Sequence, residues 1–468
     1  MTLPANPLAW AISAFADGRN DKYVTYEKYL AGDQPLAFAT DKFQSTFGQL
    51  FHEFAYNRCA AVVDAHADRL QVSGFDATDP DIAKEAQKLW EANQMSVREG
   101  HVYVDQFGDG DAYVLVDVHP ETGDVQYWTQ NPKSIRVHWD DERPNTIDLA
   151  AKMWDDDEKL CRVNLYFADR IEKYISAKAA KAGSSASLED FTPYEVEGES
   201  WPVMLAVSDT VPVFHFANNA RTNTYGVSEL RSIIPLQDAI NKSLMDLFVA
   251  MELAAFPQRV LIGIDKPETD EERELLNNFV VGMNKVLTMT DPNAKIAEFS
   301  AVNITQYTDV AEYIDKAICR VSKIPVHYLE MTGNFPSGRA QSLASIPFTK
   351  KMTDRTKADG AVWGDVQRYG VRLRGFDVKA GDIRVNWESV EDTSDDDVWD
   401  LITQQINSGV PLVTALRWNG YTEDEITQFE QDLAEYGDGS ADFSSSDRPL
   451  SGDINPEQAS ADDEQQAA

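Results

Sequence analysis

The chain has 468 residues, with 78 acidic and 42 basic side chains and a formal net charge of −36. This balance disfavours tight binding of phosphate backbones by the surface as a whole, and the length predicts two or three domains with apolar cores. No apolar run reaches about 18 residues and the N-terminus lacks a basic start, so neither a membrane span nor a signal peptide is supported.

The N-terminal half predicts a mixed region of helices and strands. Residues 1–45 are rich in aromatic side chains and are expected at the periphery. Helical patterns follow at Phe47–Leu70 and Pro80–Gln94, and Val97–His138 alternates as strands around the turns GDGD and HPETGD. The remaining expected segments are strands near Thr146–Trp154 and Lys159–Ala168, and a flexible insertion at Lys178–Glu199.

The most informative stretch is Val211–Gly263. A β-type run leads into an Asn-rich loop, after which Gly226 and the capping-type Ser228 open a helix of roughly 25 residues. Pro257 ends this helix, and a short strand is expected at Arg259–Ile264. Apolar residues recur along the helix at three- and four-residue steps: Ile233, Leu236, Ile240, Leu244, Leu247 and Met251.

A second long helix is predicted after a small mixed segment. Thr269 and Glu272 form a capping box for a helix, and a hairpin is expected from Val286–Thr290 and Lys295–Phe299. The second long helix covers about Asp309–Lys323, with an apolar stripe at Val310, Ile314, Ala317 and Val321.

The C-terminal part predicts one more long helix and an acidic end. A loop at Glu330–Arg339 precedes a helix over Ala340–Leu373, which Pro347 should kink. The segments expected after it are a strand at Asp382–Trp387, short acidic helices at Asp395–Tyr436 and a disordered acidic tail at Asp438–Ala468.

This order of elements resembles the portal proteins of tailed bacteriophages, specifically the siphophage portals that form the head-to-tail connector. In that family a strand and a G-x-S-x-L turn, here Gly226–Leu230, introduce the first of two long stem helices. The resemblance covers roughly Phe47–Gly437 and implies an α+β portal fold. The implied parts are a wing at 1–228, stem helix 1 at 229–256, a small α/β clip at 257–308, stem helix 2 at 309–329, a tunnel loop at 330–339, a kinked helix and returning wing strand at 340–394, an α-helical crown at 395–437 and a disordered acidic tail at 438–468.

The resemblance also implies a function. Such a protein forms a ring, usually of twelve copies, at one capsid vertex, where it is the channel for DNA packaging and ejection and is expected to nucleate procapsid assembly. Expected partners are the terminase large subunit, the head-completion adaptor, and the major capsid and scaffolding proteins, with weak, non-specific contact to double-stranded DNA and none to a membrane. The protein would be made in the host cytoplasm, reside in the virion, act as no enzyme and need no cofactor.

Three groups of site residues follow. Stem contacts between copies are expected at Ile240, Leu244, Leu247, Met251, Ile314 and Val321. Contact with DNA in the channel is expected at Asn334, Phe335 and Arg339 of the tunnel loop. Partner docking is expected at the acidic start of the clip helix: Asp270, Glu271 and Glu272.

Several near-motifs for catalysis or metal binding have simpler interpretations. Gly333–Ala340 has P-loop glycine spacing but lacks the phosphate-binding Lys and the Ser/Thr, and Gly226–Leu230 lacks the second glycine of a nucleophile elbow. Phe107–Asp111 is expected as a turn rather than a calcium loop. The acidic runs Asp155–Glu158 and Asp395–Asp397 are typical of a solvated turn and a helix start. The cysteines (59, 161, 319) are expected as buried thiols, and His215 as a hydrogen-bonded core histidine, with no metal site.

A local reversal of charge leaves three interpretations open. Between Arg339 and Arg374 eight basic residues face only three acids. They could form a solvated helix face, pair with the acidic surface of a neighbouring subunit, or contact DNA at the rim of a channel. For the whole chain, the alternatives to a portal are another virion structural component or a carboxylate-based hydrolase, and the sequence shows no assembled catalytic constellation.

Overall fold

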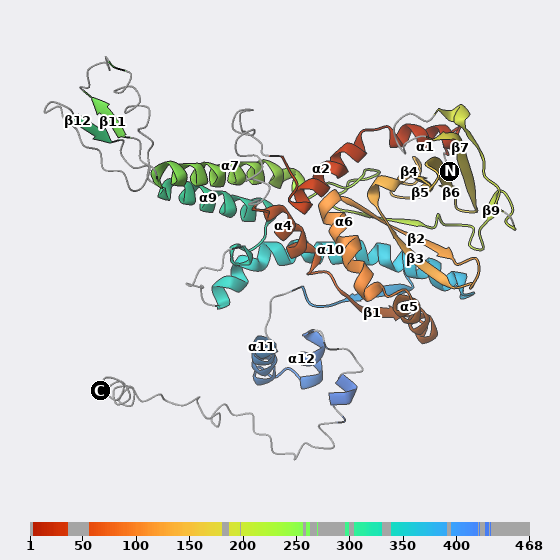
Figure 1. Ribbon diagram of the computed structural model, residues 1–468. Coiled ribbons are helices and arrows are strands. Elements are labelled where there is room, and N and C mark those ends of the chain that lie inside the picture. The colour runs from red at the N-terminus through yellow and green to blue at the C-terminus, as the bar shows by residue number, and fades with distance from the viewer. Residues whose placement is uncertain are drawn as a thin grey trace, which may run out of the picture. The chain divides into compact units, whose positions relative to one another are not determined.

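The computed structural model describes residues 3–35, 56–179, 187–196, 198–255, 259–262, 269, 295–298, 304–329, 338–390, 395–419, 421, 426–429 and 431. The chain divides into two compact units, Met1–Val390 and Glu391–Ala468 (Figure 1).

A three-stranded antiparallel sheet lies at the centre of the first unit. Its order is β10 (Val213–Ala217), β2 (Asp111–Val118) and β3 (Val125–Gln130). Helix α6 (Met95–Asp109) leads directly into β2, so the strand predicted for the first part of Val97–His138 is wrong. Its buried residues follow a helical spacing, Val102, Tyr103, Gln106 and Phe107 among them.

A second sheet forms the outer part of the first unit. It contains four consecutive antiparallel neighbours: β4 (Ile135–Trp139), β5 (Ile147–Asp155), β6 (Leu160–Tyr166) and β7 (Arg170–Ala179). Of these, β5 and β6 are the strands predicted near Thr146–Trp154 and Lys159–Ala168. Their apolar side chains pack against helix α1 (Pro7–Phe15), while Asp156–Glu158 forms the expected turn.

The segment predicted as a flexible insertion is partly ordered against this sheet. The 3₁₀ turn η2 (Leu188–Asp190) leads into β8 (Phe191–Pro193), which pairs with β7, as does β9 (Val203–Met204). The prediction failed here because short edge strands gain their stability from a neighbour, which a local sequence pattern does not show. Residues 180–186 lie outside the described part.

Residues 1–45 were expected at the periphery, but helix α2 (Arg19–Ala31) contributes side chains to the core. Tyr23 and Tyr29 are buried, and their hydroxyl groups donate hydrogen bonds of 2.7 Å to Asp111 Oδ2 and Asp238 Oδ1, respectively. The aromatic side chains therefore serve as amphipathic core residues that reach carboxylates on other elements.

The long helix α10 (Gly338–Leu373) joins the central sheet to a second small sheet. That sheet pairs β1 (Val72–Ala77) with β13 (Ile383–Trp387), the strand predicted at Asp382–Trp387. Helices α4 (Arg58–Ala67) and α5 (Pro80–Ala92) correspond to the two early predicted helices, although residues 47–55 lie outside the described part. Pro347 lies inside α10, and the kink predicted there stays a prediction.

The main apolar core lies between α10, α5 and the central sheet. Trp363 of α10 is fully buried and meets Trp90 edge to face at a ring-centroid distance of 5.0 Å, and Phe216 at 4.6 Å. Tyr127 of β3 donates a hydrogen bond of 3.0 Å to Gln367 Oε1 of α10. This core holds a sequence-distant helix on the N-terminal sheet.

Two long helices, α7 (Leu230–Ala255) and α9 (Thr305–Ser322), match the predicted rods. The strand predicted after Pro257 is β11 (Arg259–Ile262), and it pairs antiparallel with β12 (Lys295–Glu298). The prediction gave β12 a different partner, Val286–Thr290, which lies outside the described residues together with the helix predicted after Thr269. The observed pairing arises because β11 leaves the end of α7 where β12 leads back to α9 (Figure 1).

The second unit contains the short helices predicted for Asp395–Tyr436. They are α11 (Asp395–Asn407) and α12 (Leu412–Trp418), with a further helical piece at 426–429. Their small core consists of Ile402, Ala415, Leu416 and Ile426. The acidic tail at 438–468 lies outside the described residues.

One buried carboxyl group makes the stability of the first unit depend on pH. Asp359 of α10 is buried, its Oδ1 accepts a hydrogen bond of 2.8 Å from Gln106 Nε2, and burial raises its pKa to about 7. Because the folded-state pKa exceeds the unfolded value of 3.8, the native state binds the proton more tightly. This contribution to stability is fully present below about pH 4 and is lost as the pH rises through about 7.

We therefore expect Asp359→Asn to unfold at a higher temperature than the parent protein at pH 8, and with a clearly smaller difference at pH 5. The gain at pH 8 should be on the order of 4 kcal/mol, because the shift from 3.8 to about 7 spans about three pKa units and each unit corresponds to about 1.4 kcal/mol. Thermal unfolding at the two pH values measures it. Asp354→Asn, an exposed position on the same helix, is the control, and equal pH profiles for both variants would contradict the assignment.

Candidate functional site

The two long helices form the most distinctive surface feature of the first unit. Helices α7 and α9 lie side by side and run in opposite directions, with β11 and β12 beyond their outer end (Figure 1). At about 1.5 Å per residue, the 26 residues of α7 span about 39 Å. This is long for a helix that serves only a protomer core.

The predicted stem residues divide into two groups. Ile240, Leu247 and Ile314 are buried within the protomer, and Leu244 is partly buried. Ile240 and Ile314 belong to the core cluster at the base of the helix pair, and Leu244 packs against it. Met251 and Val321 are 47% and 50% exposed, so they are the members of the predicted set that remain accessible to another molecule.

Further apolar side chains are exposed on the second helix. Val310 and Tyr313 of α9 are 47% and 66% exposed and stand three residues apart, on one side of the helix. Large apolar residues that recur on the surface of a long helix pair are typical of a protein interface rather than of a solvated face. Neither Val310 nor Tyr313 belongs to the set of contact residues predicted from the sequence.

Polar side chains fix the base of the helix pair to the start of α4. Arg58 Nε donates to Asp315 Oδ1 at 2.8 Å, and Tyr56 Oη donates to Asp315 Oδ2 at 3.1 Å. Gln237 Oε1 accepts a hydrogen bond of 2.7 Å from the Arg58 backbone N–H. Since Asp315 and Gln237 are buried, these bonds satisfy groups that would otherwise be costly to desolvate.

Four helices meet at a largely buried ion pair between Lys351 and Glu229, whose side chains are 11% and 10% exposed. Lys351 of α10 lies 2.9 Å from Glu229 Oε2, just before α7, and its Nζ donates to His66 Nε2 of α4 at 2.7 Å. The same ammonium donates to the carbonyl of Ser322, at the end of α9, at 3.4 Å. One cation therefore connects both stem helices to α4 and α10.

The protonation states follow from these contacts. Burial, followed by the Lys351 charge, lowers the pKa of His66 to about 4, so the imidazole is neutral. Its Nδ1 donates to the Val62 carbonyl at 2.6 Å, which leaves Nε2 as the acceptor for Lys351. Burial is the largest influence on Glu229 and opposes its charge, but the attraction of Lys351 and the hydrogen bonds from Lys351 and Asn218 together hold the pKa of Glu229 below its usual value.

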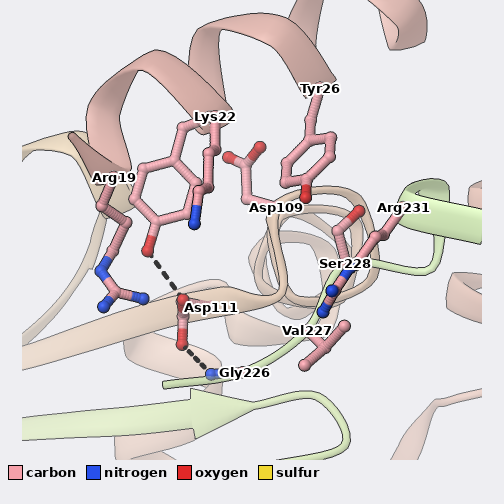
Figure 2. A pocket seen from close by; sticks show the side chains of 10 residues that line it. Arg19, Lys22, Tyr26, Asp109, Asp111, Gly226, Val227, Ser228 and Arg231 are labelled. Atoms are coloured by element: carbon pink, nitrogen blue, oxygen red, sulfur yellow. Dashed lines mark hydrogen bonds between the residues drawn. The ribbon is translucent and has the colours of Figure 1, made fainter. Parts of the chain in front are cut away.

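A second junction places the start of α7 against β2. Asp111 accepts hydrogen bonds of 2.7 Å from Tyr23 Oη and from His215 Nε2. It accepts a third bond of 2.7 Å from the Gly226 backbone N–H (Figure 2). A Cβ atom on Gly226 would lie 1.8 Å from the Gly110 carbonyl oxygen, so the two chain segments approach too closely for any side chain. Ser228 Oγ accepts from the Leu230 N–H at 3.0 Å, which confirms the predicted capping role.

The prediction for His215 is confirmed, since it is buried against Asp111 and stacks on Tyr113 at 4.7 Å. The sequence did not indicate the role of Asp111. It stands in the GDGD segment expected as a hairpin turn, where Gly110 at φ +96° instead ends α6. The sequence signal for this arrangement was Gly110, because a glycine is common at the C-terminus of a helix as well as in a hairpin turn.

The basic stretch on α10 pairs largely within the chain. Lys351 binds Glu229, Arg372 lies 2.7 Å from Asp209, and Arg374 lies 3.3 Å from Glu85. Arg368 lies 3.2 Å from Asp365 of the same helix. Pairing with acids on other elements of the same chain, here Glu229, Asp209 and Glu85, was not among the three interpretations of the basic stretch. These acids are far from it in the sequence, and only the tertiary fold brings them close.

Several predicted site residues lie outside the described part of the chain. These are Asp270, Glu271 and Glu272 of the clip and Asn334 and Phe335 of the tunnel loop, while Arg339 is in the first turn of α10. Among the described residues, no three His, Cys, Asp or Glu side chains gather closely enough to hold a metal ion. None of the described helices has the length and apolar character that a membrane crossing requires.

Comparison with known proteins decides the family. A family model described as "Phage portal protein, SPP1 Gp6-like" matches residues 61–438. The chain belongs to this family. Portal proteins are structural components, so membership confirms both the resemblance and the prediction that the protein is not an enzyme.

Individual relatives agree with this assignment. The portal protein of Mycobacterium phage D29 is 26% identical over 447 residues, which cover 92% of this chain and 89% of the relative. That of Mycobacterium phage L5 is 26% identical over 386 residues, 80% of this chain and 74% of the relative. A solved chain from the virion of a native gene transfer agent particle is 11% identical, with a TM-score of 0.43, and the match covers 83% of this chain and 99% of that chain. A solved chain from the C12-symmetric neck of the native particle is 12% identical, with a TM-score of 0.46, and the match covers 85% of this chain and 99% of that chain.

We expect Lys351→Met to lower the free energy of unfolding by about 3 kcal/mol, because Glu229 would remain buried without its cation. Lys350→Met is the matched control, since its exposed Nζ lies 4.0 Å from Asp354, and its effect should stay within about 0.5 kcal/mol. Chemical denaturation of the three proteins measures the difference. Adding Glu229→Gln to Lys351→Met should recover part of the loss, and equal stabilities of the two single variants would show that the buried pair does not hold the junction.

Proposed function

We propose that the chain assembles into a closed ring, with twelve copies as the expected number, at one vertex of a phage capsid. The ring would form the channel through which DNA is packaged and ejected, and would connect the head to the tail within the virion. The observation that carries this proposal, beside the family, is the long helix pair with exposed Met251, Val310, Tyr313 and Val321.

A ring suits this surface because the exposed side chains lie on two different helices. In a head-to-tail interface, one face of a protomer meets a different face of the next, and rotation by a fixed angle closes the assembly. Stem helix pairs placed around an axis would bury apolar groups that a single protomer leaves in water. The same proposal assigns the wing, stem, clip, tunnel loop, kinked helix and crown to the segments predicted from the sequence.

The net charge suits a channel that must release its cargo. Twelve copies would carry 12 × −36, or −432, formal charges. The Debye length at physiological salt is about 8 Å. Acidic side chains of a channel wall within that distance of the DNA would therefore still repel its phosphate groups. The basic residues of α10 are largely neutralised by acids of their own chain, which leaves few cations to hold DNA in place.

The ring is tested by placing charges at the exposed positions. We expect Met251→Asp with Tyr313→Asp to give monomers in analytical ultracentrifugation, with unchanged helical content by circular dichroism, because the charges would be buried between copies. Ser232→Asp with Gln306→Asp adds the same charge at exposed polar positions of α7 and α9 and should leave the rings intact. Intact rings from the first variant would contradict the proposed interface. Leu247 is less suitable for this test, because it is buried within the protomer.

The clip is proposed to dock the terminase during packaging and the head-completion adaptor afterwards. Its two described strands, β11 and β12, lie at the outer end of the helix pair, which supports this assignment. Charge reversal at Asp270, Glu271 and Glu272 should weaken terminase or adaptor binding in pull-down experiments while rings still form. Unchanged binding would place the docking surface elsewhere.

The tunnel loop is proposed to contact DNA weakly through Asn334, Phe335 and Arg339. Gly333 and Gly338 permit backbone states closed to other residues, while Pro336 restricts them, so the loop should be hinged. Replacing residues 334–337 with a Gly-Ser linker should preserve rings and terminase binding but reduce DNA packaging or retention. Wild-type packaging of full-length genomes would make the loop a simple connector.

A further inference from the structure

A cavity of about 260 Å³ opens between α2, the α6–β2 connection and the start of α7. It has the volume of roughly eight to nine water molecules at about 30 Å³ each, enough for a small polar ligand. Three basic side chains from two elements line it: Arg19 and Lys22 of α2, and Arg231 of α7. Figure 2 shows Lys22 and Arg231 extending toward the same space from different sides.

The three cations differ in how they are held. Arg19 is fixed, because its guanidinium stacks on the Tyr225 ring at 3.7 Å and its Nε lies 3.2 Å from Asp17. Among the residues that the structure describes, neither Lys22 nor Arg231 forms an ion pair or a side-chain hydrogen bond. Two positive charges therefore face the cavity without an acidic partner, in a chain with a large excess of acids.

Neither carboxyl group of the wall forms an ion pair with these two cations. Asp111 instead accepts three hydrogen bonds, from Tyr23, His215 and the Gly226 N–H. Asp109 is buried, and burial together with the neighbouring acids Asp105 and Glu27 raises its pKa to about 8, so it is mostly uncharged at neutral pH. The hydroxyl group of Tyr26, at the same wall, adds a possible donor.

We propose that this cavity binds a phosphate group, held by Arg231 and Lys22 and bordered by the fixed guanidinium of Arg19. A dianionic tetrahedral group matches two unpaired positive charges, whereas a single carboxylate would leave one of them unbalanced. Guanidinium groups donate two hydrogen bonds in the geometry that phosphate oxygens accept, and the ammonium of Lys22 adds a point charge. The start of α7 adds the positive end of a helix dipole.

The phosphate group has two candidate sources, free phosphate and the backbone of DNA. Isothermal titration calorimetry of the assembled full-length protein with inorganic phosphate, against sodium chloride of equal ionic strength, tests the shared chemistry. A second titration with a short duplex of about 20 base pairs, with and without phosphate, distinguishes the sources. Competition between duplex and phosphate would identify the DNA backbone as the source, and phosphate binding without competition would identify the free anion.

The decisive variant is Lys22→Gln with Arg231→Gln, in which both positions are exposed and the fold should persist. We expect at least about tenfold weaker phosphate binding, because two charge-assisted contacts are lost. Lys84→Gln with Arg384→Gln removes the same charge from exposed positions elsewhere and should bind like the parent protein. No saturable phosphate binding by the parent, or equal affinity in both double variants, would overturn the proposal. Ring formation is measured separately, so neither result bears on the proposed portal function.

Discussion

The arrangement of the long helices depends on one buried ammonium group. Lys351 meets Glu229 at 2.9 Å, His66 at 2.7 Å and the Ser322 carbonyl at 3.4 Å, so the ammonium and its three partners join four separate parts of the chain. An ion pair out of water is sensitive to geometry, since a small displacement loses the attraction while the desolvation cost remains. The start of α7, the end of α9 and the body of α10 are thereby held in one relation, with aromatic rings of Phe107 and Phe348 around His66.

The junction at Gly226 acts next to this ion pair and fixes the other side of the same helix start. Asp111, immediately after α6, receives hydrogen bonds from α2, from β10 and from the Gly226 N–H, so one carboxylate joins three elements. The close approach of Gly226 to Gly110 makes this possible, because a side chain at either position would force the segments apart. The base of the helix pair is therefore held at two neighbouring points.

Charge is distributed in accordance with the proposed ring. Lys351 and Arg372 of α10, and Arg374 just after it, are bound by acids on other elements of the same chain, whereas exposed apolar side chains remain on α7 and α9. An apolar interface gains its stability from removing surface from water and does not require charges of opposite sign. It therefore suits an assembly of strongly acidic subunits, whose net charges repel one another. The cavity at α2 is an exception, since Lys22 and Arg231 have no acidic partner among the described residues.

The sequence by itself determined the features that depend on local periodicity. The stripe from Ile233 to Met251 predicted α7, the pattern from Val310 to Val321 predicted α9, and their order with the strand at Arg259 led to the portal family. Local patterns could not decide the role of Val97–Phe107, because alternating and helical apolar spacings overlap over so short a stretch, and the helix gains its stability from packing on β2 and α4. The partner of β12, the burial of Tyr23 and the ion pair of Lys351 were decided only by the tertiary structure. Each of them joins residues far apart in the sequence, and no local pattern records which distant segments come into contact.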